Sequence, residues 1–77
     1  MRLVERMRRP AAEPVLTPRE LDVLSQVALG CTNQQAAQRL SISPETVKGY
    51  LRSAMAKLGV NSRAAAVVAA RRSGLLP

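Results

Sequence analysis

The sequence predicts an all-α domain of four helices, in which the second and third helices form a helix-turn-helix. Apolar residues recur at helical spacing, and a Ser, Thr or Asn capping residue precedes each predicted helix. Only Ser41 and Ile42 separate the second helix from the cap of the third, so the two helices must cross at a steep angle. The helices are expected at residues 18–29, 33–40, 44–58 and 62–73.

The first helix has a complete start signal. Thr17 is the candidate N-cap, Pro18 takes the first helical position, and Glu20 completes a capping box. Gly30 is placed to terminate the helix. The apolar residues that repeat at helical spacing, and are expected to face the core, are Leu21, Leu24, Val27 and Ala28.

The second helix is short and has small residues on its apolar side. Thr32 is the expected N-cap, with Gln35 as its reciprocal partner. The residues expected to be buried are Ala36, Ala37 and Leu40. Because alanine ends at the Cβ atom, another helix can approach this side closely.

The third helix has two distinct faces. Ser43 is its expected N-cap, Pro44 takes the first helical position, and Gly59 ends it after Lys57. The expected core stripe is Val47, Leu51, Ala54 and Leu58. The opposite face has no apolar side chain longer than a methyl group and carries Glu45, Lys48, Gly49, Arg52 and Ala56.

The fourth helix is apolar nearly all round over residues 64–70, which an isolated surface helix would not be. One side is therefore expected to pack on the domain. The other side is expected to meet a second copy of the chain in a homodimer, through Ala65, Val68 and Ala69. The alternatives are that these residues complete the core, or that another domain covers them.

Charge is the main clue to the partner. Twelve Lys and Arg against five Asp and Glu give a net charge of +7. Residues 17–77 hold eight of these cations and three of the anions, so +5 belongs to the predicted helical domain. Such an excess favours a polyanionic partner. The alternative is that basic residues only keep a small domain soluble.

Composition argues against an enzyme, a metal or a cofactor. The chain has one cysteine, Cys31, and no histidine, so it offers neither an internal disulfide nor an imidazole for catalysis or metal binding. Cys31 lies in the loop between the first two helices and is interpreted as structural. No apolar run is long enough to span a membrane and no secretory signal is present, so a cytoplasmic protein without membrane contact is expected.

Residues 1–15 are expected to form a basic arm ahead of the domain at residues 16–77. The arm holds Arg2, Arg6, Arg8 and Arg9, followed by two prolines, Pro10 and Pro14, that discourage continuous helix. A linker to a larger parent protein is the preferred interpretation. The alternative is a basic extension that touches phosphates.

A set of residues spread over positions 16–76 carries a resemblance to a known family. These residues are Leu16-Thr17-Pro18-Arg19-Glu20, Val23-Leu24, Gly30, Thr32-Asn33, Ala37, Leu40, Ile42-Ser43, Thr46-Val47-Lys48, Lys57-Leu58-Gly59-Val60, Ser62-Arg63, Ala66-Val67, Ala70 and Gly74-Leu75. Over this range, without gaps, the chain resembles the DNA-binding domain of LuxR-type (FixJ- or NarL-like) bacterial transcription regulators. The resemblance implies that the third helix reads the major groove and that the fourth contributes to a homodimer.

The resemblance also implies roles for individual residues. Lys48, Gly49 and Arg52 are expected to face the bases, which agrees with the exposed face of the third helix. The residues expected at phosphates are Thr32, Asn33, Thr46 and Tyr50. Tyr50 replaces a histidine that is frequent in the family, and packing is an equal alternative for it. Gly49 offers no side chain to a base but would let the helix sit deeper in the groove.

Each of these assignments has a plainer alternative. Lys48 and Arg52 could form an ordinary solvated helix face. Thr32, Asn33 and Thr46 could serve only to cap helices. The remaining basic residues of the last helix, Arg63, Arg71 and Arg72, either extend the positive surface or are simply solvated.

The predicted function is sequence-specific binding of double-stranded DNA by a bacterial transcription regulator near the nucleoid, as a homodimer. The alternative is a protein-interaction module that docks on another regulator or on the transcription machinery. An N-terminal regulatory domain is a further expected partner. RNA binding ranks third, because Tyr50 is the only aromatic residue and single-stranded recognition relies on stacking.

Overall fold

The computed structural model describes residues 15–77, so the predicted basic arm lies outside the described residues except for Val15. Within that range the chain forms helices and no strand, which confirms the all-α prediction. The helices are α2 at Pro18–Ala28, α3 at Asn33–Leu40, α4 at Pro44–Leu58 and α5 at Arg63–Arg72. Only the end of α2 and both ends of α5 differ from the expected positions, each by one residue.

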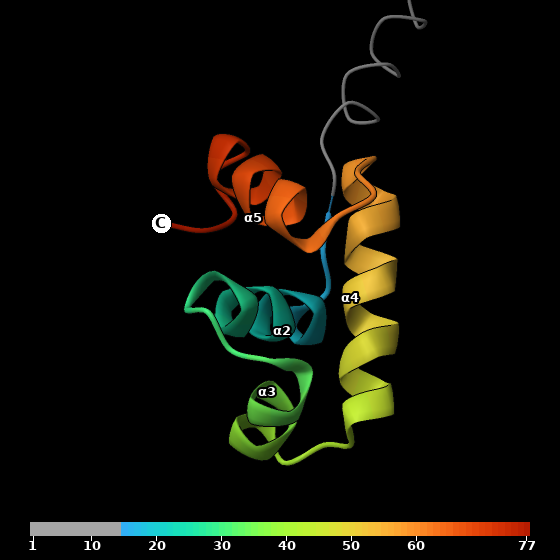
Figure 1. Cartoon of the computed structure of the whole chain (residues 1–77). Coiled ribbons are helices and arrows are strands. Elements are labelled where there is room, and N and C mark those ends of the chain that lie inside the picture. The colour runs from blue at the N-terminus through green and yellow to red at the C-terminus, as the bar shows by residue number, and fades with distance from the viewer. Residues whose placement is uncertain (1–14) are drawn as a thin grey trace, which may run out of the picture.

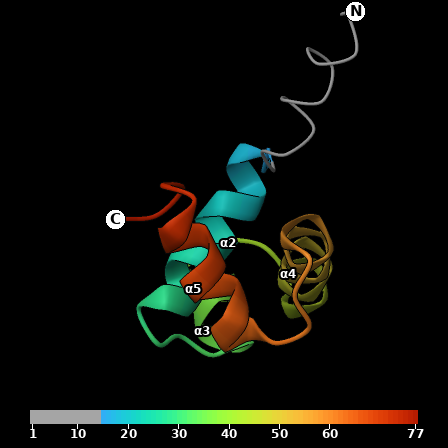
Figure 2. The same cartoon turned by 90° about the horizontal axis from the view of Figure 1, so that it is seen from above.

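The longest helix, α4, runs along one side of the domain, and the other three helices stack beside it (Figure 1). Figure 2 looks along α4 and shows α2 and α5 crossing its direction. Helix α4 packs against α2, α3 and α5. One side of α4 is therefore committed to the core, and the other side is left to solvent.

The predicted caps are confirmed. Thr17 and Thr32 each form a complete capping box, with Glu20 and Gln35 as the reciprocal partners. Ser43 accepts a hydrogen bond from the amide of Thr46 at 3.1 Å. These caps satisfy backbone donors that would otherwise lack partners at the helix starts.

The turn between α3 and α4 depends on a residue that the sequence did not single out. Ser41 adopts a left-handed conformation with a φ of 59°, which is uncommon for a residue other than glycine. It ends α3, and the next amide, that of Ile42, donates to the carbonyl of Ala37 at 3.0 Å. This pattern is a C-terminal helix cap, and it redirects the chain within two residues.

The core is aliphatic and lies where the four helices meet. Its buried members are Leu16, Val23, Leu24, Ala36, Ala37, Val47, Leu51, Ala54, Ala66, Val67, Ala70 and Leu76. On α2 the residues expected to face the core do so, because Leu24 is buried and Leu21, Val27 and Ala28 pack against the core, but Val23, which was not expected there, is fully buried too. The reason is that α2 packs against three helices at once, so its buried face is centred on Val23 and Leu24. The expected core residues Leu40 and Leu58 are also only half-buried.

Candidate nucleic-acid interface

The two faces of α4 separate as the sequence predicts. Val47 and Ala54 are fully buried, and Leu51 is nearly so. Lys48 and Arg52, one turn apart, are exposed. Burial of the first face fixes the rotation of α4 about its axis, and that rotation presents the second face to solvent.

Lys48 and Arg52 form neither an ion pair nor a hydrogen bond with any residue in the described range. Exposed lysines and arginines often pair with nearby carboxylates, as Arg19 does with Asp22 at 3.6 Å. The two cations on α4 therefore remain available to an outside acceptor. Between them, Gly49 has no side chain, and a Cβ atom built there would meet nothing within 4 Å.

The start of α3 presents two of the predicted phosphate contacts. Thr32 is exposed, and its hydroxyl accepts from the amide of Gln35 at 3.1 Å. Because a hydroxyl also has a proton, Thr32 can cap the helix and still donate to an anion. Asn33 is half-buried, and its Oδ1 accepts from Nη1 of Arg63 at 3.0 Å.

The two remaining predicted phosphate contacts lie on α4. Thr46 is exposed, and its hydroxyl lies 2.8 Å from that of Ser43. Tyr50 is half-buried and packs against the core. Packing, one of the two interpretations left open for Tyr50, is thus part of its role.

Glu20 holds α4 in place, and sequence reasoning missed this contact. Its side chain is only 4% exposed, and its Oε1 accepts from the amide of Thr17 at 2.8 Å and from Nζ of Lys57 at 2.9 Å. The hydroxyl of Ser53 donates to the other carboxylate oxygen, Oε2. The carboxylate that caps α2 thus also joins that helix to α4 by two contacts.

The electrostatics of this cluster favour the ionised carboxylate. The hydrogen bond from Ser53 is the largest cause that lowers the pKa of Glu20 to about 2. Burial acts in the opposite direction, and the contacts from Lys57 and Thr17 lower the pKa further. Glu20 was expected only as a cap and Lys57 only as a cation at a helix C-terminus. No local pattern signals a pairing across 37 positions.

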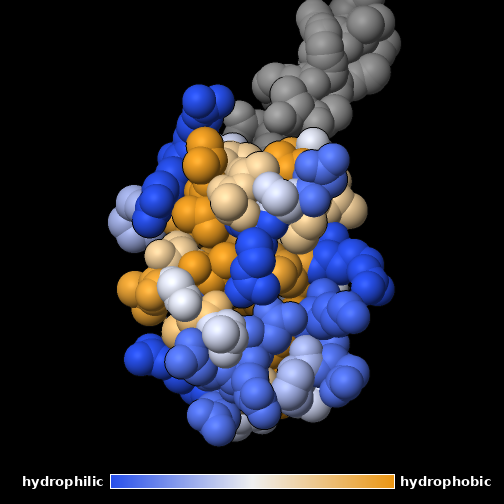
Figure 3. All heavy atoms as spheres, in the orientation of Figure 1, coloured by the Kyte–Doolittle hydropathy of each residue, from blue (hydrophilic) through white to orange (hydrophobic). Residues whose placement is uncertain are grey.

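The predicted dimer residues of α5 lie on its outer side. Val68 is 50% exposed, and Ala65 and Ala69 are half-buried. They line a shallow groove together with Val60, Arg72 and Ser73. Figure 3 shows apolar side chains gathered over α2 and α5, whereas the end of the domain with α3 and the start of α4 is polar.

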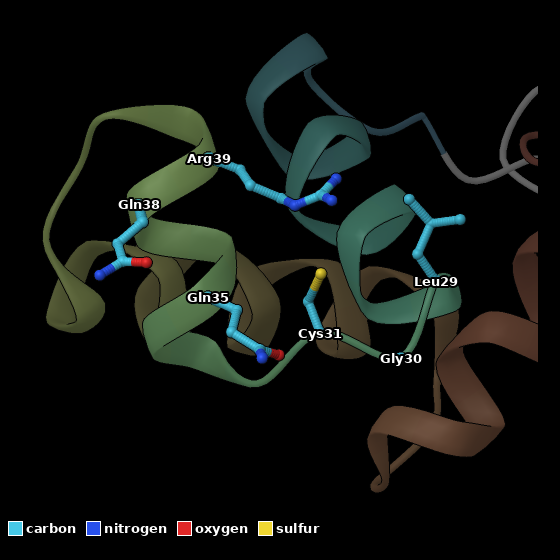
Figure 4. Close-up of a pocket in the computed structure, with 6 residues that line it drawn as sticks. All are labelled: Leu29, Gly30, Cys31, Gln35, Gln38 and Arg39. Atoms are coloured by element: carbon cyan, nitrogen blue, oxygen red, sulfur yellow. The ribbon is translucent and has the colours of Figure 1, made fainter.

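Cys31 lies in a polar hollow between α2 and α3 (Figure 4). Its thiol is half-buried and lies 3.6 Å from Oε1 of Gln26, which also accepts from Arg39 at 3.4 Å. Within residues 15–77 no cluster of three or more His, Cys, Asp or Glu could hold a metal ion. None of the described helices is long and apolar enough to cross a membrane.

Comparison with known proteins places this geometry in a family. The family model described as "Bacterial regulatory proteins, luxR family" matches residues 14–70. The chain is 61% identical over 62 residues to the HTH-type transcriptional activator RamA of Corynebacterium glutamicum, a match that covers 80% of this chain and 22% of RamA. It is 52% identical over 54 residues to the nitrate/nitrite response regulator NarP of Escherichia coli, covering 70% of this chain and 25% of NarP.

Two solved structures of transcription regulators share the fold of this chain. The transcription factor GerE superposes with a TM-score of 0.77 at 29% identity, covering 80% of this chain and 92% of GerE. The response regulator ChrA of a haem-sensing two-component system superposes with a TM-score of 0.78 at 40% identity, covering 95% of this chain and 35% of ChrA. The chain thus spans about a quarter or less of RamA and NarP. It belongs to the LuxR family of bacterial transcription regulators, and residues 15–77 fold as the helix-turn-helix DNA-binding domain of that family.

Proposed function

We propose that this domain binds double-stranded DNA sequence-specifically, with α4 in the major groove. The observation that carries the proposal is the pair of exposed cations on α4, Lys48 and Arg52, which have no partner within residues 15–77. The major groove admits an α-helix, and Lys or Arg can donate to guanine O6 and N7. Gly49 lies between them and adds no side chain that would hold the helix away from the bases.

The starts of α3 and α4 supply contacts that set the register of the domain on the duplex. Thr32, Asn33 and Thr46 lie at helix starts, where backbone amides and the helix dipole favour anions. Phosphate contacts of this kind position the protein but do not read sequence. Tyr50 is proposed as an additional phosphate contact through its hydroxyl, while its ring packs on the core.

The proposed active form is a homodimer in which α5 meets its counterpart. Apart from Arg72, the groove beside Ala65, Val68 and Ala69 is lined by small or short side chains, which would let two helices approach closely. A dimer with two-fold symmetry would recognise inverted half-sites about one helical turn apart. We further propose that the domain acts on bacterial DNA in the cytoplasm. We also propose that a regulatory domain controls it, because the relatives RamA and NarP are long enough to contain a further domain.

Selection from a randomised duplex library with residues 1–77, at about 0.15 M salt, tests the proposal. A selected palindrome would support specific recognition by a dimer, and a single half-site would support recognition without the dimer. A Lys48→Ala/Arg52→Ala variant is expected to select no motif. An Arg19→Ala/Arg39→Ala variant, which loses the same charge, is expected to select the motif of the unmodified chain.

A protein-interaction module is the second candidate. The observation in its favour is exposed apolar surface away from α4, where Val15 is 77% exposed and Leu29 is 70% exposed. The protein partner of such a module would be another regulator or the transcription machinery. If the selection yields no motif, the protein-interaction module becomes the preferred function, because the affinity for DNA would then be only electrostatic.

A further inference from the structure

Arg63, the first residue of α5, makes two contacts with the segment that leads into α3. Its Nη1 donates to Oδ1 of Asn33 at 3.0 Å, and its Nη2 donates to the carbonyl of Cys31 at 3.0 Å. These acceptors lie on either side of Thr32, the N-cap of α3. One guanidinium thus bridges two points at the start of α3, about 30 positions earlier in the chain.

The contact decides which way the Asn33 amide points. A guanidinium has donors only, so the amide oxygen must face Arg63. The amide nitrogen, Nδ2, then points to the other side, and it has no hydrogen-bond partner within residues 15–77. Asn33 is only half-buried, and we take this donor to be accessible to an outside acceptor.

The second contact holds the backbone. The carbonyl of Cys31 belongs to the loop between α2 and α3, which has no regular structure of its own. A fixed fork of two N–H donors can hold the loop carbonyl and the amide at the same time, which a flexible ammonium group could not do as well. The start of α3 is thereby tied to α5.

We infer that Arg63 is a positioning residue for DNA binding, which acts through Asn33 and not through its own charge. Arg63 orients the Asn33 amide so that the two N–H donors of that amide face a phosphate, and it fixes the loop that leads into α3. The inference depends on the proposed function, because it assigns a role at the phosphate contact that the function requires.

A double-mutant cycle tests the inference, with affinity measured for the duplex selected by the unmodified chain. Arg63→Ala and Asn33→Ala are each expected to weaken binding about tenfold, roughly the worth of one charge-assisted or phosphate hydrogen bond. The double variant is expected to be at most about twofold weaker than either single variant, because both changes remove one interaction. Because Arg63 is exposed, its replacement should leave the domain folded. The thermal midpoint of each variant checks this.

The salt dependence separates positioning from direct contact. If Arg63 neutralised a phosphate itself, Arg63→Ala would reduce the slope of log K against log salt by about 1. Acting through a neutral amide, it should leave the slope nearly unchanged. Arg19→Ala removes an equal charge without touching Asn33 and should leave both affinity and slope close to those of the unmodified chain.

The outcomes separate this inference from the proposed function. Independent losses that multiply in the double variant, or a slope lower by about 1 for Arg63→Ala, would overturn the positioning role and leave DNA binding intact. An unmodified chain that binds the selected duplex no better than a scrambled duplex of equal length would overturn the proposed function, and the role of Arg63 with it.

Discussion

Individual residues on α4 serve either the core or the exposed face. Val47 is fully buried, and its neighbour Lys48 is exposed with no partner in the described range. An isolated exposed cation contributes little to stability, so its replacement should affect binding far more than folding. Substitutions of single residues on α4 can therefore separate effects on DNA binding from effects on folding.

Lys48→Ala is expected to weaken binding to the selected duplex by about 1–3 kcal/mol and to relax sequence preference at one base pair. Its thermal midpoint should stay near that of the unmodified chain, because the side chain is exposed and forms no ion pair or hydrogen bond with a described residue. Binding titrations against the selected duplex and against its single-base variants measure both effects. Arg19→Ala is the control of equal charge, and an equal loss of preference there would refute a base-reading role for Lys48.

Gly49→Ala is expected to stabilise the fold by about 0.5–1 kcal/mol, because glycine is a poor helix former. A Cβ atom at this position meets nothing within 4 Å, and the residue has no left-handed backbone conformation to maintain. In a domain of this size the change should raise the thermal midpoint by roughly 2–8 °C. Gly59→Ala is the opposite control, since its φ of 71° makes any side chain strained. A lower midpoint for Gly49→Ala would show that the glycine serves the fold.

At the scale of elements, the position of α4 rests on apolar packing and on one buried polar cluster. The Glu20 carboxylate accepts from the Thr17 amide in the capping box of α2, and it also reaches Ser53 and Lys57 in the second half of α4. Removal of Ser53 or Lys57 would leave the buried Glu20 carboxylate without one of its partners in a site of low solvent access. The cluster is therefore expected to matter more for stability than any exposed ion pair of the domain.

Glu20→Gln is expected to lower the free energy of unfolding at pH 7 by about 1.5–3 kcal/mol, the range for hydrogen bonds to charged groups. Asp22→Asn, which alters an exposed carboxylate on the same helix, should change it by less than about 0.5 kcal/mol. Chemical denaturation of the two variants and the unmodified chain gives the comparison. Equal effects of the two changes would contradict the role of Glu20.

The pKa of Glu20 predicts how this contribution varies with pH. The pKa is about 2 in the folded chain against an ordinary value of 4.5, so folding favours the ionised form. The stability that Glu20 provides is therefore complete above about pH 4.5 and is lost as the pH falls towards about 2. Denaturation between pH 7 and pH 2 should show a smaller decline for Glu20→Gln than for the unmodified chain. Parallel declines would contradict the lowered pKa.

How much the sequence could predict depends on the range of the interaction. Caps such as Thr17 and Thr32 act over three residues, so local pattern located the helix starts correctly. The pairing of Glu20 with Lys57 and the bridge from Arg63 to Asn33 join distant segments, which a single sequence does not indicate. Ser41 was also missed, because nothing in its residue type demands a left-handed conformation.

Among the site residues, too, the sequence predicts some features and misses others. The exposure of Lys48 and Arg52 followed from the helical period, because burial of Val47 and Leu51 determines which residues face outward. The half-buried ring of Tyr50 did not follow from it, since the angle on a helical wheel gives no distance to neighbouring helices. The sequence thus predicts the face, and packing decides how much of each side chain remains free on it.

At the scale of the whole domain, the exposed cations of α4 and the apolar groove of α5 lie on different helices. A separate dimer surface would let two copies associate without covering the face proposed to bind DNA. Each copy could then place its own α4 on one half-site. The dimer and the recognition helix can therefore be tested independently.

Val68→Glu is expected to abolish cooperative binding to two inverted half-sites while it leaves binding to one half-site within about twofold. The side chain is 50% exposed, so the fold should tolerate the change, whereas two carboxylates facing each other across a two-fold axis would repel. The measurement compares affinities for duplexes with one and with two half-sites. Leu29→Glu introduces the same charge at another exposed apolar residue and should retain cooperativity. If Val68→Glu kept the preference for two half-sites, α5 would not be the dimer surface, and loss of cooperativity in both variants would point to added charge as the cause.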